Sequence, residues 1–148
     1  RAAREYLLEK LGGRVPLDIE IKWSGPDLDR ALGPGTFVVL IAEFKNALLG
    51  SDALGRRGKP AEVVGKEAAE KLVREIESGA PIDRHMGDQL ITWLSLAQGT
   101  SRIKVSELTM HTYTCIYIVR EILDVKINVD GEIGGPAEIT INGIGLQP

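Results

Sequence analysis

The sequence predicts an α+β fold (an α/β sandwich), organised as two small α+β layers. One observation is the order of its patterns: helix, three strands and helix, then helix, strand, helix, strand and strand, with a break near residues 79–81. The second group reads αβαββ, which is a βαβαββ-type repeat that lacks its first strand. A third observation is size, because 148 residues with 43% apolar side chains can bury about two-thirds of the unfolded chain's surface. A stable core therefore needs no disulfide or metal.

The first part begins inside a helix. Residues 1–11 place apolar side chains near helical spacing, and Gly12 provides the C-terminal stop. Over residues 17–23, apolar and charged side chains alternate, which predicts a half-buried strand. Glycine and proline punctuate residues 24–35, which indicates a loop.

A hairpin and a long helix follow. The short apolar run 36–42 predicts a buried strand, with residues 47–50 as the returning arm. Residues 55–59, GRRGK, form a basic turn. Pro60 suits the first position of a helix that ends at Gly79. The apolar stripe of this helix consists of Val64, Ala68, Leu72, Val73 and Ile76.

The second part alternates helices with strands. A helix begins near Asp83 and is closed by Gly99. Its inward-facing side chains are predicted to be Met86, Leu90, Trp93, Leu94 and Ala97. A strand around 103–105 leads to a second helix, whose stripe consists of Cys115, Ile118, Val119 and Ile122. Strands around 125–129 and 139–141 complete the unit.

Composition excludes several classes of protein. One cysteine leaves no disulfide within the chain and no Cys-based zinc site, and it favours a reducing compartment. A net charge of −3 is unlike that of a strongly basic protein that coats nucleic acid. No apolar run approaches the roughly 20 residues that span a membrane, so we expect no membrane contact and a cytoplasmic location. Motifs for a phosphate loop, a dinucleotide fold and a serine-hydrolase elbow are missing.

His111 is one candidate for chemistry, because it lies where a strand passes into a helix. Unpaired N–H groups and the positive end of the dipole at a helix start can hold a phosphate beside the ring. A neutral imidazole is nucleophilic near pH 7 and can form a phosphoramidate. Thr112 and Thr114 add hydroxyls for capping or phosphate contact. On these grounds alone, a capping or packed histidine is the commoner explanation.

His85 is the other histidine, and it opens the segment HMGDQ. Asp88 and Gln89 follow three and four residues later, so all three lie near one helical face. A stacking ring, a carboxylate and an amide suit a purine or a nucleotide-bound metal, although a solvated helix face explains them equally well. Cys115 lies on an apolar stripe and is interpreted as a buried thiol.

The stretch DRHMGDQLITWLSLAQGTSRIKVSELTMHTYTCIYIVREI resembles the C-terminal catalytic segment of RNA 3'-terminal phosphate cyclases. The features that carry the likeness are the triplet DQL, the small-residue turn at 97–99, and the His-x-x-Thr pattern of His111 and Thr114. Upstream, RAAREYLLEKLGG, GPGTFVVLIAE and LGRRGKPAEVVG look like the family's inserted domain. The likeness covers nearly the whole chain and is strongest over residues 84–123.

The resemblance implies three βαβαββ repeats, with a small α+β domain inserted in the last one. Residues 1–80 would be the insert domain, and residues 81–148 would be the C-terminal catalytic part of the last repeat. The strand missing from the repeat, and an N-terminal part with further ATP-contacting and metal-binding residues, would precede this chain. We expect that missing part of the same polypeptide as a partner, and we expect the chain alone to be inactive.

The resemblance also implies a reaction, the ATP-dependent conversion of an RNA 3'-phosphate to a 2',3'-cyclic phosphate. His111 would attack the α-phosphorus of ATP, form a histidine–AMP bond and expel pyrophosphate. AMP would pass to the 3'-phosphate of an RNA end, and the neighbouring 2'-hydroxyl would then displace it. Mg²⁺ would accompany the triphosphate, without a dedicated site in this chain.

Five consecutive residues match the family's ATP-contacting stretch: His85, Met86, Gly87, Asp88 and Gln89. In the family, an aromatic ring commonly begins this motif and can stack on adenine, a role that His85 could take. The basic turn could touch the RNA backbone through Arg56, Arg57 and Lys59, but an exposed basic turn is the simpler account.

A protein of another class stays open as the alternative. The cyclase-like factors of ribosome biogenesis and rRNA processing share the fold but act by binding, and they lack the nucleophilic histidine. The presence of His111 together with Thr114 favours the enzyme.

Overall fold

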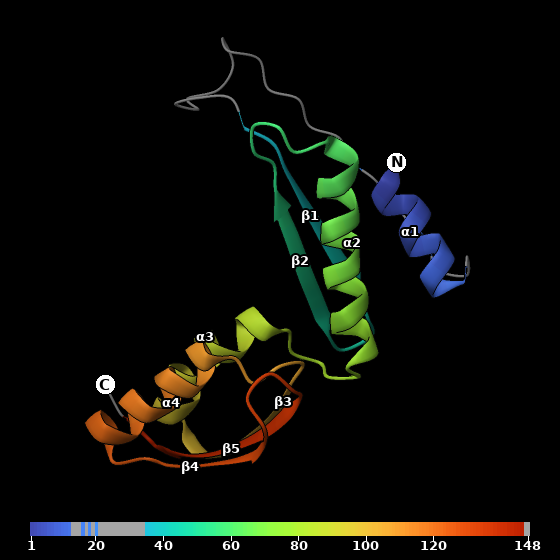
Figure 1. The fold of residues 1–148 in the computed structure, drawn as a ribbon. Coiled ribbons are helices and arrows are strands. Elements are labelled where there is room, and N and C mark those ends of the chain that lie inside the picture. Colours follow the sequence, from blue (N-terminus) through green and yellow to red (C-terminus); the bar gives the residue numbers. More distant parts are fainter. Residues whose placement is uncertain (13–15, 17, 19, 21–34, 147–148) are drawn as a thin grey trace. The chain divides into compact units, whose positions relative to one another are not determined.

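The computed structural model of the chain describes residues 1–12, 16, 18, 20 and 35–146 (Figure 1). Helices and small sheets both occur, so the predicted α+β class is confirmed. The elements are α1 (Ala2–Leu11), β1 (Phe37–Glu43), β2 (Leu48–Leu54), α2 (Ala61–Glu77), α3 (Arg84–Leu96), β3 (Gln98–Val105), α4 (Met110–Leu123), β4 (Lys126–Gly131) and β5 (Ala137–Ile144). The strand predicted over residues 17–23 and most of the loop after it lie outside the described residues.

The chain forms two compact units. One consists of Arg1–Ile41 and Ser51–Val73, and the other of Ala42–Gly50 and Arg74–Pro148. The last turn of α2 therefore belongs to the second unit. The predicted domain boundary between residues 80 and 81 remains a prediction.

In the first unit, α2 packs on one face of the β1–β2 hairpin. The buried core consists of Ala53, Val64 and Ala68, with Val38 and Leu40 packed against it. The Ser51 hydroxyl donates a hydrogen bond of 2.8 Å to the carbonyl oxygen of Ala68. Helix α1 approaches α2 at Gly65, where an added Cβ would lie 3.3 Å from the backbone nitrogen of Ala3. A bare backbone at this position lets the two helices come close.

The second unit is an antiparallel sheet covered on one face by two helices (Figure 1). The strand order is β3-β5-β4, with Val105 opposite Ala137 and Ile127 opposite Ile141. This is the predicted αβαββ order. The opposite face of the sheet is polar, and an ion pair of 3.3 Å joins Arg102 to Glu138 there.

The core of the second unit lies between the sheet and the helices. Its buried residues are Ile91, Val105, Leu108, Ile116, Val119, Val125, Ile127, Ala137, Ile139 and Ile141. Gly87 faces this core, because an added Cβ would lie 3.1 Å from Cγ1 of Val105. The missing side chain at Gly87 therefore allows α3 to pack closely on β3.

The predicted inward faces of α3 and α4 are partly wrong, although Leu94, Cys115 and Val119 do pack in or against the core. Helix α3 buries Gly87, Ile91 and Ser95, and α4 buries Thr112, Ile116 and Val119. Several side chains from the predicted stripes are instead exposed: Met86, Trp93, Ile118 and Ile122. Each helix has two apolar sides. The side that packs against the sheet is the one whose small residues allow close approach. The larger apolar side of each helix consequently faces away from the sheet.

Two element boundaries also differ from the prediction. Helix α3 ends at Leu96, and Gly99 lies within β3, because Ala97 is already extended at the C-cap. Strand β2 continues to Leu54, beyond the predicted arm. Helix α4 begins at Met110, which agrees with the predicted strand-to-helix junction at His111, and the Thr109 side chain caps it by accepting a hydrogen bond from the N–H of Thr112.

Candidate functional site

His111 lies in the first turn of α4, directly after the loop that follows β3. Its side chain is 88% exposed. The Thr109 hydroxyl and carbonyl already satisfy the N–H groups of Thr112 and Tyr113. The N–H groups of Met110 and His111 come earlier in the turn, where an α-helix provides no internal acceptor. The helix start thus offers an imidazole beside donors that can bind an anion.

The ring of His111 is held by Asp88, from the first half of α3. The Nδ1 atom of His111 lies 2.8 Å from Oδ2 of Asp88, whose side chain is 23% exposed. A carboxylate accepts hydrogen bonds, so this contact favours the tautomer that carries its proton on Nδ1. The lone pair is then on Nε2, on the other side of the ring. The contact orients the ring of His111, and the spacing of these residues in the sequence does not reveal it.

The other members of the predicted ATP-contacting stretch lie on different sides of α3. Asp83 caps this helix, because its Oδ1 accepts hydrogen bonds from the N–H groups of His85 and Met86 at 3.0 and 2.8 Å. His85, Met86 and Gln89 are exposed, whereas Gly87 is buried against the sheet and Thr112. Of these five residues, the structure brings Asp88 into hydrogen-bond contact with His111.

The two threonine hydroxyls near His111 have structural partners. Thr112 is fully buried, and its Oγ1 lies 3.0 Å from that of Thr109. The Thr114 hydroxyl donates to the carbonyl oxygen of Met110 at 2.8 Å. The capping role that the sequence suggested for these hydroxyls falls to Thr109, which the sequence reasoning missed. A Thr two residues before a candidate His at a strand-to-helix junction is the signal that could have identified it.

Cys115 lies close to the same contact but is not part of it. Its thiol is partly buried and donates a weak hydrogen bond of 3.6 Å to the carbonyl oxygen of Asp88. This contact helps to pack α4 against α3 where the Asp88–His111 pair lies. It agrees with the interpretation of Cys115 as a packed thiol.

Neither histidine lies in a metal-binding cluster. Among the described residues, no group of three or more His, Cys, Asp or Glu side chains is close enough to hold a metal ion. Near His111, the donor set is one carboxylate that already contacts an imidazole. These residues do not fit a metal ion held by the described part of this chain.

The basic turn divides into two kinds of residue. Lys59 is engaged, because its ammonium contacts the Glu67 carboxylate and the carbonyl oxygen of Leu54. This contact lowers the pKa of Glu67 below its ordinary value of 4.5, chiefly through the hydrogen bond from Lys59. Arg56 and Arg57 are exposed, and neither forms an ion pair with a residue in the described part of the chain. Lys59 therefore stabilises the turn, and the two arginines remain accessible.

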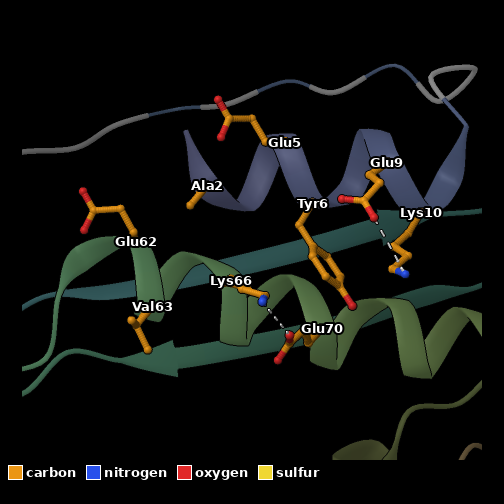
Figure 2. Close-up of a pocket in the computed structure, with 9 residues that line it drawn as sticks. All are labelled: Ala2, Glu5, Tyr6, Glu9, Lys10, Glu62, Val63, Lys66 and Glu70. Carbon is orange, nitrogen blue, oxygen red and sulfur yellow. Dashed lines mark ion pairs between the residues drawn. The ribbon is translucent and has the colours of Figure 1, made fainter.

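A cavity of about 630 Å³ lies between α1 and α2, in the first unit (Figure 2). Its lining includes Tyr6, whose ring is 5.7 Å from the ammonium of Lys10 and 5.9 Å from that of Lys66. Four glutamates also line it: Glu5, Glu9, Glu62 and Glu70. This balance of charge disfavours a triphosphate. The cavity contains none of the site residues that the sequence predicted.

No helix among the described residues is both long and apolar enough to cross a bilayer. The predicted cytoplasmic location stays a prediction.

Comparison with known proteins gives a consistent result over the whole chain. The family model described as "RNA 3'-terminal phosphate cyclase (RTC), insert domain" matches residues 1–77. A curated relative named RNA 3'-terminal phosphate cyclase, from Desulfurococcus amylolyticus, is 50% identical over 131 residues, which cover 87% of this chain and 37% of the relative. Its counterpart from Korarchaeum cryptofilum is 46% identical over 140 residues, covering 95% of this chain and 38% of the relative. A third, from Ignicoccus hospitalis, is 39% identical over 148 residues, covering 99% of this chain and 41% of the relative.

The chain thus spans about two-fifths of the length of these relatives. The two longer alignments cover most of the chain, so the similarity is not confined to the segment that the insert-domain model matches.

Proposed function

Because the chain belongs to the RNA 3'-terminal phosphate cyclase family, we propose that it forms part of an enzyme that converts RNA 3'-phosphate ends to 2',3'-cyclic phosphates at the expense of ATP. The relatives bear the name of this activity. The observation that supports the proposal most directly is the hydrogen bond between Nδ1 of His111 and Asp88. It belongs to a histidine whose Nε2 is available for attack.

In the proposed first step, Nε2 of His111 attacks the α-phosphorus of ATP. The N–P bond forms as the bond from that phosphorus to the bridging oxygen breaks, and pyrophosphate leaves. The ring gains positive charge in this step, and the Asp88 carboxylate stabilises the charge through the Nδ1 proton. The free N–H groups at the start of α4 can hold the phosphate oxygens in place.

In the second and third steps, the activated phosphate is transferred. A 3'-phosphate oxygen of the RNA attacks the phosphorus of the histidine–AMP, and the neutral imidazole is released. The 2'-hydroxyl then attacks the 3'-phosphorus, loses its proton, and displaces AMP as the ring closes. Adenylylation makes chemical sense here, because a phosphate monoester lacks a good leaving group and its adenylate has one.

ATP would lie against the exposed side of the α3 amino terminus. His85 could stack on the adenine, and Met86 and Gln89 are exposed beside it. Gly87 would contribute through packing, since it faces the core. Mg²⁺ would enter with the triphosphate and neutralise its charge, since the described residues hold no metal site of their own.

A further part of the same polypeptide is the partner we propose for this chain. The apolar sides of α3 and α4 that face away from the sheet are uncovered, with Trp93 71% and Ile122 73% exposed. A soluble helix rarely leaves such a stripe in water unless another element covers it. The curated relatives are long enough to supply that element. We therefore expect residues 1–148 alone not to cyclise RNA ends.

The alternative, a cyclase-like factor that binds without catalysis, is less well supported. Such a factor has no need of a nucleophilic histidine, and here His111 is both exposed and hydrogen-bonded to a carboxylate. A protein with a purely binding role also has no reason to orient the ring.

The test uses the longer polypeptide that carries this chain, with an oligoribonucleotide whose 3'-phosphate is radiolabelled. With ATP, we expect the label to become resistant to phosphatase, because a cyclic diester is not a phosphatase substrate. A matched oligonucleotide with a 2'-deoxy 3'-end has no 2'-hydroxyl to close the ring, so it should stop at the adenylate. Its label is then also protected from phosphatase, but the product keeps the AMP group and is heavier than a cyclic ester by that mass. If both ends stay sensitive at every ATP concentration, the proposal is wrong.

A further inference from the structure

Arg84, the first residue of α3, contacts two carboxylates from different segments. Its Nε lies 2.8 Å from Oε1 of Glu75, in the last turn of α2. Its Nη2 lies 2.8 Å from Oε2 of Glu107, in the loop between β3 and α4. A guanidinium is planar, so the direction of one contact largely determines the direction of the other.

The two contacts differ in how firmly they are held. Glu75 is only 3% exposed, and its Oε2 has no hydrogen-bond partner among the described residues. The pKa of Arg84 is raised, chiefly by the hydrogen bond with Glu75, so the guanidinium stays charged at every working pH. A buried carboxylate depends on its cation, which means that Glu75 fixes the position of Arg84. Glu107 is partly exposed and pairs with the other end of the guanidinium. Glu75, Arg84 and Glu107 together form the Arg84 cluster.

This cluster lies directly before the Asp88–His111 contact. Arg84 precedes Asp88 by four residues, and Glu107 precedes His111 by four residues. The two segments are already aligned there, since the N–H of Ser106 donates to the carbonyl oxygen of Ile82 at 2.8 Å. The ion pair and the nucleophile's hydrogen bond are therefore successive links between the same two segments.

We propose that Arg84, aimed by Glu75, is a positioning residue that fixes the loop before α4 through Glu107 and thereby holds the His111 ring on the Asp88 carboxylate. This inference rests on the proposed function, in which the Nε2 atom of His111 is the nucleophile. Without the Arg84–Glu107 link, α4 can shift relative to α3. The ring then spends less time in the tautomer and orientation that present Nε2 to a phosphate.

The test uses Glu107→Ala in the longer polypeptide. This variant removes the partly exposed Arg84–Glu107 ion pair and leaves the buried Glu75–Arg84 pair intact, so no buried charge loses its partner. The matched control is Glu138→Ala, which removes the carboxylate of another ion pair with an arginine, Arg102, on the outer face of the same sheet. Loss of an exposed ion pair by itself should affect both variants alike.

One readout is the single-turnover formation of histidine–AMP. For Glu107→Ala, we expect the rate constant at saturating ATP to fall about 10-fold or more, as happens when a group that supports a reactive residue is lost. The half-saturating ATP concentration and the labelled fraction should match the wild type. Partial unfolding would lower the labelled fraction instead of the rate constant. A wild-type rate constant in Glu107→Ala would overturn the proposal.

A second readout does not depend on activity. The ¹⁵N chemical shifts of the His111 ring nitrogens report which nitrogen carries the proton. We expect Glu107→Ala to shift them toward a mixture of tautomers, and Glu138→Ala to leave them unchanged. Unchanged shifts in both variants would overturn the positioning role. If the wild type forms no histidine–AMP, the proposed function fails, and the ring shifts still decide the role of Arg84.

Discussion

The Nδ1 atom of His111 lies 2.8 Å from Oδ2 of Asp88, and this contact between two residues 23 positions apart in the sequence joins the first halves of α3 and α4. The sequence predicted both residues as members of a site, but it assigned them separate tasks. Their pairing depends on α3 and α4 lying side by side on the same face of one sheet. The pattern of each helix alone does not define that arrangement.

The first prediction concerns Asp88→Asn in the longer polypeptide. An amide can donate a hydrogen bond to Nδ1, which favours the tautomer with its proton on Nε2 and removes the nucleophilic lone pair. We expect the rate constant for histidine–AMP formation to fall about 100-fold or more. Asp130→Asn, an exposed carboxylate on β4, should behave as the wild type. A rate constant for Asp88→Asn within a factor of two of the wild type would exclude Asp88 as the group that orients the ring.

The second prediction concerns the packing of β5 against the end of α3. A Cβ at Gly143 would lie 2.1 Å from the carbonyl oxygen of Ala97 and 2.6 Å from that of Leu94. Gly143→Ala should therefore lower the free energy of unfolding by about 3 kcal/mol or more. At Gly135, the nearest atom to an added Cβ is 3.6 Å away, so Gly135→Ala should change stability by less than about 1 kcal/mol. Urea denaturation measures both, and equal stabilities of the two variants would contradict the packing described here.

The third prediction concerns pH. The pKa of Glu67 is lowered from 4.5, chiefly by the hydrogen bond from Lys59, so the contact stabilises the folded state above that pH. This stabilisation is lost as the pH falls through the lower pKa of the folded state. We expect Glu67→Gln to have a lower melting temperature than the wild type at pH 7, and the difference to shrink toward zero in acid. A difference that stays constant down to pH 2 would show that the ionised carboxylate is not its source.

The fourth prediction concerns the uncovered sides of α3 and α4. In residues 1–148 alone, Trp93→Ser and Ile122→Ser should change stability by only about 0.5 kcal/mol, because both side chains are in water. In the longer polypeptide, each should cost about 2 kcal/mol or more if a further part of the chain covers them. Equal small effects in both contexts would mean that this surface has no partner within the polypeptide.

Local sequence patterns determine some features of this fold and leave others undefined. The second unit's order of elements was predicted correctly, because each strand and helix carries its own periodicity. The inward faces of α3 and α4 were partly misassigned, since Met86, Trp93 and Ile122 are as apolar as the residues that the sheet buries. Gly87 and Ser95 were overlooked because small residues contribute little to an apolar stripe, although they allow the closest packing.

In the candidate site, too, local patterns predicted some features and missed those that depend on packing. His111 was located by its position at a strand-to-helix junction, and its resemblance to a family motif supplied a role. The cap at Thr109, the Asp88 contact and the Arg84 cluster all depend on how segments that are distant in the sequence pack together. Sequence patterns do not define those contacts.

The proposed reaction depends on a covalent bond between His111 and AMP. The most direct measurement incubates the longer polypeptide with ATP labelled at the α-phosphate, digests it, and identifies the labelled peptide by mass. We expect an acid-labile label on His111 that is absent from His111→Ala and present in His85→Ala. Label that persists in His111→Ala, or that maps to another residue, would contradict it.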